Sequence, residues 1–227
     1  MATRFDISDN LIHFTRGNSI NDAFTVLRTI IAERRLIAGN GMIKGGYRCV
    51  CFTEAPLMAF RRDFVSRIPF TRYFQFGLLF SKTWVYEHGG RPVIYQPEAD
   101  FDLLPQELRW RHVRFELTGE QVVDFTWERE WRIRCTELAF SERDAVIVVP
   151  NQEWADALVR AHDEEQDIEI QQYSRVVDLQ IAELWRESFG GMSCHFNKAS
   201  GYNRVRCPRK PSNLEIECPQ TSSRPQV

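Results

Sequence analysis

The sequence predicts an α+β fold, with one packed domain at residues 1–189 and a basic tail at residues 190–227. Short apolar or alternating runs, typical of strands, are interspersed with segments whose apolar residues recur every three or four positions, as in helices. After Phe189 the composition changes to glycine, serine and four prolines, with six Lys/Arg against two Glu. A chain of 227 residues with 43% hydrophobic residues can bury one substantial core.

The first half of the chain predicts alternating strands and helices. Ile20, Phe24, Leu27 and Ile31 fall at helical spacing and form one apolar stripe. The run at 73–80 is too apolar to be anything but a buried strand. In order, we expect a strand at 10–15, a helix at 20–35, a strand at 47–53, a helix at 55–65 and a strand at 73–80.

The second half predicts further mixed elements, with the segment at 101–117 giving the weakest pattern. Leucines there suit a helix, interrupted near Pro105 because proline removes a backbone donor. In order, we expect a strand at 92–95, a helix at 101–117, a strand at 125–135, a strand at 145–149, a helix at 153–161, a strand at 168–170 and a helix at 176–187.

Charge and cysteine content exclude several classes of protein. A net charge of -2 gives no global reason to bind nucleic acid, so such binding would need a local basic face. No window approaches the roughly 20 apolar residues of a membrane span, and the N-terminus has no apolar signal core, so we expect a cytoplasmic protein. Its six cysteines are then expected to be free thiols, with Cys49 and Cys51 packed on one strand face. Cys194, His195, Cys207 and Cys218 carry metal-binding side chains, but their spacings fit no standard pattern and they lie in the expected tail, so we expect no metal site.

The segment 127–132 carries the densest group of candidate catalytic residues. In an extended strand Glu128 and Glu130 share one face, with Cβ atoms about 7 Å apart. Two carboxyl groups at this separation influence each other's ionisation and suit chemistry at a glycosidic bond. The plainer interpretation is an exposed charged face, balanced by Arg132 and Arg134.

Two other short motifs carry polar side chains at strand ends. His13 and Thr15 lie two residues apart on one face of the first strand, where they can hydrogen-bond a sugar or an amide. Thr53 ends a strand and Glu54 follows it, which is also the pattern of a simple helix cap. A structural role is the simpler explanation for each motif taken alone.

The order of these motifs resembles that of a family of phage-defence proteins. It runs through 11–15, 51–57, 90–95 and 128–132, with a helix after the first motif, and the resemblance covers roughly residues 10–150. That family is the abortive-infection AbiGi type. The sequence also resembles, more distantly, DarT-type ADP-ribosyltransferases, including the DarT-like toxin of the CmdTAC toxin, antitoxin and chaperone system.

The resemblance implies a split β-sheet with flanking helices around a central NAD site. It implies that Glu130 is catalytic and that Glu128 is its companion carboxylate. His13 and Thr15 would hold the nicotinamide ribose and amide, and Tyr95 would lie along the nicotinamide. Thr53 would belong to the same NAD-binding group. The pyrophosphate would meet Arg48, Arg61 or Arg62, which the sequence does not distinguish.

The function implied is that of an NAD-dependent ADP-ribosyltransferase toxin. NAD would be its substrate, and a partner antitoxin, with a chaperone in some systems, would restrain it. Modification of a base requires an unstacked base, which favours single-stranded RNA, or single-stranded DNA, as acceptor. Arg129, Arg132, Arg134 and the basic tail would contact phosphates.

Two alternatives remain open at the level of sequence. The first is a catalytically silent abortive-infection protein that binds a separate toxin. The second is a metal-dependent nuclease that uses Glu128 and Glu130 as ligands. Consumption of NAD, and its dependence on Glu130, separates the three hypotheses.

Overall fold

The computed structural model describes residues 7–56, 73–119, 121–165, 173 and 176–179. Its elements are β1 (Asn10–Arg16), α1 (Ile20–Glu33), β2 (Arg35–Ile37), β3 (Cys49–Thr53), β4 (Tyr73–Ser81), α2 (Lys82–Glu87), β5 (Arg91–Pro92), β6 (Ile94–Gln96), η2 (Glu98–Leu103), η3 (Arg109–Arg111), β7 (His112–Arg114), η4 (Thr126–Glu128), β8 (Glu130–Arg134), β9 (Glu137–Ala139), β10 (Ala145–Val149), α3 (Gln152–Glu165) and β11 (Val176–Asp178). The predicted α+β class is confirmed.

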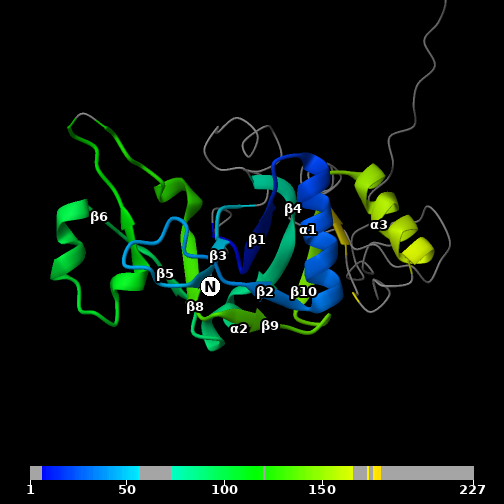
Figure 1. The fold of residues 1–227 in the computed structure, drawn as a ribbon, viewed down its shortest axis with the longest axis horizontal. Coiled ribbons are helices and arrows are strands. Elements are labelled where there is room, and N and C mark those ends of the chain that lie inside the picture. Colours follow the sequence, from blue (N-terminus) through cyan, green and yellow to red (C-terminus); the bar gives the residue numbers. More distant parts are fainter. Residues whose placement is uncertain (1–6, 57–72, 120, 166–172, 174–175, 180–227) are drawn as a thin grey trace, which may run out of the picture.

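A mixed seven-stranded sheet organises the fold, in the order β11-β10-β4-β1-β3-β8-β5. All of its neighbouring strands are antiparallel except β10 and β11. Two small two-stranded sheets, β2 with β9 and β6 with β7, lie outside it. Figure 1 shows α1 against the sheet near β4 and β10, α3 at one end of the molecule, and β6 with its surrounding loops at the other.

The main core lies between the sheet and helices α1 and α3. Leu27 and Ile31 of α1, Phe76 of β4 and Leu158 of α3 are almost wholly buried in it. Phe24, Phe76 and Trp154 pack ring against ring, with centroids 4.9–5.5 Å apart, and so join α1, β4 and α3. Each such side chain contributes about 1.5–3 kcal/mol by burial, so this face supplies much of the stability that holds the sheet in place.

Helix α1 begins and ends as its sequence dictates. The hydroxyl of Ser19 accepts from the backbone of Asp22, and the Asp22 carboxylate accepts from the backbone of Ser19, which is a capping box. The helix ends at Arg34, whose left-handed backbone (φ 52°) turns the chain straight into β2. The helix is therefore two residues shorter than the one expected at 20–35, and β2 begins at Arg35.

Several expected elements differ from the structure. The helix expected at 101–117 is wrong: the chain forms the short 3-10 helices η2 and η3 and the strand β7, because Phe101, Trp110 and His112 are buried singly rather than along one helical face. The start of the helix expected at 176–187 is instead β11, which pairs with β10. Of the helix expected at 55–65 the structure describes only residues 55 and 56, which are not helical, and the strand at 168–170 and the tail at 190–227 lie outside the described residues.

No helix in the described ranges is long and apolar enough to cross a membrane. The cysteines within these ranges, Cys49, Cys51 and Cys135, are free thiols as expected.

Candidate active site

The candidate site lies where strand β1 separates from β3. The two strands pair only at Ile12 opposite Thr53, although β1 continues along β4 as far as Arg16. In place of further backbone pairing, Nδ1 of His13 donates to the carbonyl oxygen of Cys51 at 2.8 Å. Burial, with a smaller contribution from the charge of Arg16, lowers the pKa of His13 to about 4 against the opposing effect of the Cys51 hydrogen bond. His13 is therefore neutral at physiological pH and braces the opening in the sheet.

Glu128 and Glu130 do not lie on one extended strand, which corrects the expectation for 125–135. Glu128 ends the 3-10 helix η4, and β8 begins at Glu130. Between them Arg129 has a left-handed backbone, with φ 46° and ψ 49°. One such residue breaks the alternation of a strand, so the two carboxyl groups have different surroundings.

Two of the predicted cofactor-binding hydroxyl groups instead hold the backbone that carries these carboxyl groups. The Thr53 hydroxyl donates to the carbonyl oxygen of Glu128 at 2.5 Å. The Tyr95 hydroxyl accepts from the backbone N–H of Glu130 at 3.1 Å. Burial, with the nearby Glu130, raises the pKa of Tyr95 to about 12, so its hydroxyl stays protonated. Thr53 and Tyr95 are thus brought to the site, as supports for Glu128 and Glu130.

Glu130 forms a buried bidentate ion pair with Arg132. Its two carboxylate oxygens lie 2.8 Å from Nε and 3.2 Å from Nη2 of Arg132. The remaining nitrogen, Nη1, donates to the carbonyl oxygens of Trp110 and His112 at 2.9 and 3.0 Å. Arg132 is therefore fully occupied inside the protein, and its expected role as a phosphate contact is wrong.

Glu128 holds a proton more readily than an exposed glutamate does. Burial, followed by the charge of Glu130, raises its pKa to about 7, against the opposing effects of Arg16 and Arg132. A carboxyl group with a raised pKa beside a second carboxylate that an arginine holds suits an acid or base beside an electrostatic stabiliser.

Arg16 and Tyr73 complete the cluster and have no counterpart in the sequence-based prediction. The guanidinium of Arg16 lies 4.5 Å from the centre of the Tyr73 ring and donates to its hydroxyl. Although burial opposes the charge, Tyr73 and Glu128 raise the pKa of Arg16. The register shifts between Phe14 and Arg16, and this bulge is what the sequence pattern did not reveal.

Cys51 lies under the carboxylate of Glu130. Burial raises the pKa of its thiol well above the usual range, and the charge of Glu130 and a hydrogen bond to it act in the same direction. The thiol is therefore protonated and unreactive at neutral pH, which agrees with the packing role expected from the sequence.

Thr15 and Arg48, the other predicted cofactor contacts, make internal hydrogen bonds elsewhere. The Thr15 hydroxyl is buried and donates to the carbonyl oxygen of Phe76 at 3.2 Å. Arg48 donates to the carbonyl oxygen of Ala38 at 2.8 Å. Neither is joined to the carboxyl pair, and the alternatives Arg61 and Arg62 lie outside the described residues. Across the described ranges, no group of three or more His, Cys, Asp or Glu side chains is arranged to hold a metal ion.

Comparison with known proteins adds no assignment. No protein-family model, no curated protein and no solved structure matches this chain. The function is therefore argued from the chemistry of the carboxyl pair and its surroundings.

Proposed function

We propose that the protein is an NAD-dependent ADP-ribosyltransferase toxin that modifies single-stranded nucleic acid, RNA in preference to DNA. The observation that carries the proposal is the unequal carboxyl pair: Glu128 has its pKa raised to about 7, while Glu130 is held by Arg132. The order of motifs in the sequence supports the same family of reactions and its setting, in which an antitoxin restrains the enzyme until phage infection.

Glu130 is suited to stabilise the reacting sugar. When nicotinamide leaves NAD with the electrons of its bond to ribose, positive charge develops on the sugar, and a fixed carboxylate beside it lowers the barrier. Tyr95 fixes the backbone of Glu130 and Arg132 fixes its two oxygens, so the carboxylate needs no reorganisation during the reaction.

Glu128 is suited to remove the acceptor's proton. As the acceptor's amine nitrogen forms a bond to C1″ of the ribose, that nitrogen must lose a proton, and a carboxylate whose pKa is close to neutral can take it. The charge of Arg16 keeps part of the Glu128 population ionised at physiological pH, because it opposes the effect of burial. The roles of the two residues therefore differ, as their surroundings do.

A silent binding partner of a separate toxin is the second candidate, and one observation favours it. The ion pair with Arg132 neutralises much of the negative charge that Glu130 would present to a reacting sugar. His13 and Thr15 likewise direct hydrogen bonds to backbone carbonyl oxygens of the protein itself.

The experiment incubates the protein with labelled NAD and, separately, single-stranded RNA, single-stranded DNA and cell protein. The test variant is Glu130→Gln, which keeps a hydrogen-bond acceptor for buried Arg132; Glu142→Gln, at an ion pair near β9, is the matched control. Transfer of label by wild type and by the control, but not by Glu130→Gln, supports the enzyme and names its acceptor. If wild-type protein neither transfers label nor releases nicotinamide, the silent partner is the better assignment.

A further inference from the structure

Two arginines lie together along the edge strand of the large sheet. Nη1 of Arg91 donates to the carbonyl oxygens of Gly90 and Tyr86 at 2.6 and 3.0 Å. Nε of Arg111 donates to the carbonyl oxygen of Pro92 at 2.9 Å. The two guanidinium groups are thus anchored to carbonyl oxygens two residues apart, on Gly90 just before β5 and on Pro92 within β5, the last strand of the sheet.

Neither arginine has a carboxylate partner among the residues that the structure describes. Other arginines of this part of the molecule do: Arg109 pairs with Asp102, Arg114 with Glu116 and Arg132 with Glu130. Burial, and then the charge of Arg91, lowers the pKa of Arg111, so the two cations are close enough to repel each other. An anion between them would relieve that repulsion.

Each arginine uses one nitrogen atom to bind backbone carbonyl oxygens, and this anchoring also protects the edge of the sheet. Guanidinium groups on the free carbonyl oxygens of an edge strand prevent it from pairing with another chain. A single arginine would serve that purpose with less repulsion. The other nitrogens of both groups donate to nothing within the described ranges, and they are held in place by the anchored atoms.

An aromatic ring adjoins the pair. The guanidinium of Arg91 lies 4.0 Å from the centre of the Tyr86 ring on α2, and Tyr86 is 53% exposed. An exposed ring beside fixed cations is the combination by which proteins hold single-stranded nucleic acids, because the ring stacks on a base while the cations bind the backbone.

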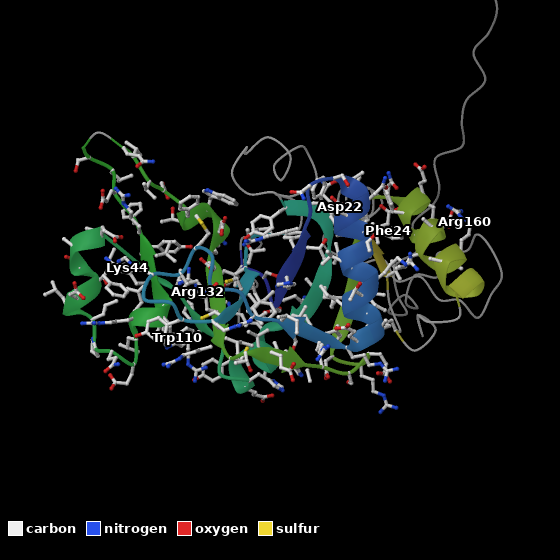
Figure 2. The ribbon with its side chains drawn as sticks, viewed as in Figure 1. Asp22, Phe24, Lys44, Trp110, Arg132 and Arg160 are labelled. Atoms are coloured by element: carbon white, nitrogen blue, oxygen red, sulfur yellow. The ribbon has the colours of Figure 1, made fainter. Side chains whose placement is uncertain are left out.

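We propose that Arg91 and Arg111 form a phosphate-binding site for the backbone of a single-stranded nucleic acid, with Tyr86 as a stacking surface for one of its bases. The choice of nucleic acid as ligand rests on the proposed function. Strand β5 pairs directly with β8, with Arg91 opposite Arg132 and Pro92 opposite Trp131, so a strand bound here passes beside Glu130. Figure 2 labels Arg132 in this half of the molecule and Arg160, on α3, at its other end.

The test measures the binding of a labelled single-stranded RNA oligonucleotide by fluorescence anisotropy, between about 50 and 200 mM salt. The double variant Arg91→Gln/Arg111→Gln is compared with wild type and with Arg160→Gln, which removes a positive charge from α3. Each lost phosphate contact reduces the salt slope by about 0.7, so the double variant is expected to bind roughly 25-fold more weakly at 0.1 M salt. If the double variant does not fold, each single variant is expected to lose roughly fivefold.

The outcomes separate this inference from the proposed function. An Arg91/Arg111 variant that binds RNA as tightly as Arg160→Gln overturns the site. If it keeps RNA affinity but loses affinity for NAD or inorganic phosphate, the anion is a free phosphate or the pyrophosphate of NAD, and the assignment to nucleic acid is wrong. Loss of RNA binding in a protein that consumes no NAD would leave the phosphate site standing and remove the transferase.

Discussion

The raised pKa of Glu128 predicts that Glu128→Gln stabilises the protein at alkaline pH and not at acidic pH. The unfolded chain releases this proton near pH 4.5, whereas the folded protein keeps it until about pH 7. Stability is therefore lost as the pH rises through this interval, and the loss is constant above it. A glutamine has no proton to lose, so the variant escapes the penalty.

The size of the effect follows from the shift. From 4.5 to about 7 is about 2.5 pKa units, or at most about 3.4 kcal/mol at 1.36 kcal/mol per unit. Glu128 is only partly buried, and solvent screening reduces this to about 2 kcal/mol. For a chain of this size that corresponds to a melting temperature about 4–8 °C higher than that of wild type.

The assay is thermal or urea unfolding of wild type and Glu128→Gln at pH 4 and pH 8. Asp124→Asn is the control, because hydrogen bonds from Thr126 lower the pKa of that exposed carboxyl, so its replacement should not stabilise the protein at pH 8. Transferase activity should fall in Glu128→Gln while stability rises. A stability difference that is the same at both pH values would refute the reasoning.

Three further predictions concern the neighbours of Glu128. Glu130→Ala should destabilise the protein by about 3–5 kcal/mol in denaturant unfolding, because it leaves buried Arg132 unpaired, whereas Glu130→Gln should cost much less; equal losses would contradict this. As the pH falls from 6.5 to 4, the wild-type protein should lose stability, because only the unfolded chain protonates His13 in that range. His13→Asn should lose less stability over the same interval, which melting curves at pH 6.5 and pH 4 test. Arg16→Gln should shift the acidic limb of the pH–activity profile to higher pH, because the base Glu128 acts when ionised and Arg16 lowers its pKa; an unchanged profile, measured with NAD and RNA, would exclude that charge interaction.

The sequence correctly predicted the elements whose apolar residues follow the regular spacing of a helix or strand. The apolar stripe at 20–35 became α1, and the apolar runs at 73–80 and 145–149 became the neighbouring strands β4 and β10. It failed at 101–117, where burial is decided by contacts with distant parts of the chain. Phe101, for example, is covered by Lys44, whose ammonium group lies 4.4 Å from the ring centre. No local periodicity records such a contact.

The sequence predicted only part of the candidate site, and the reason is again that contacts between distant residues decide the rest. Glu128 and Glu130 were identified by residue type and spacing, Thr53 and Tyr95 were added by the family resemblance, and the structure brings the four together. Their division into carboxyl groups and supports depends on hydrogen bonds between residues far apart in the chain. Arg16 was missed because a bulge in β1 determines its position, and that bulge has no sequence signature here.

The left-handed residue Arg129 is the reason that two glutamates two positions apart acquire different properties. On a continuous strand, Glu128 and Glu130 would both lie on the face of Arg132, and one cation would partner both. With the turn, Glu130 alone begins the strand and takes the fork of Arg132, while the backbone of Glu128 is held by Thr53. The largest influence that favours an ionised Glu128 is then Arg16, which belongs to the opposite side of the opening between β1 and β3. Burial and Glu130 raise the proton affinity of Glu128, and the separation of these two strands places the arginine that opposes them, so a ligand that moves Arg16 would change the charge of Glu128.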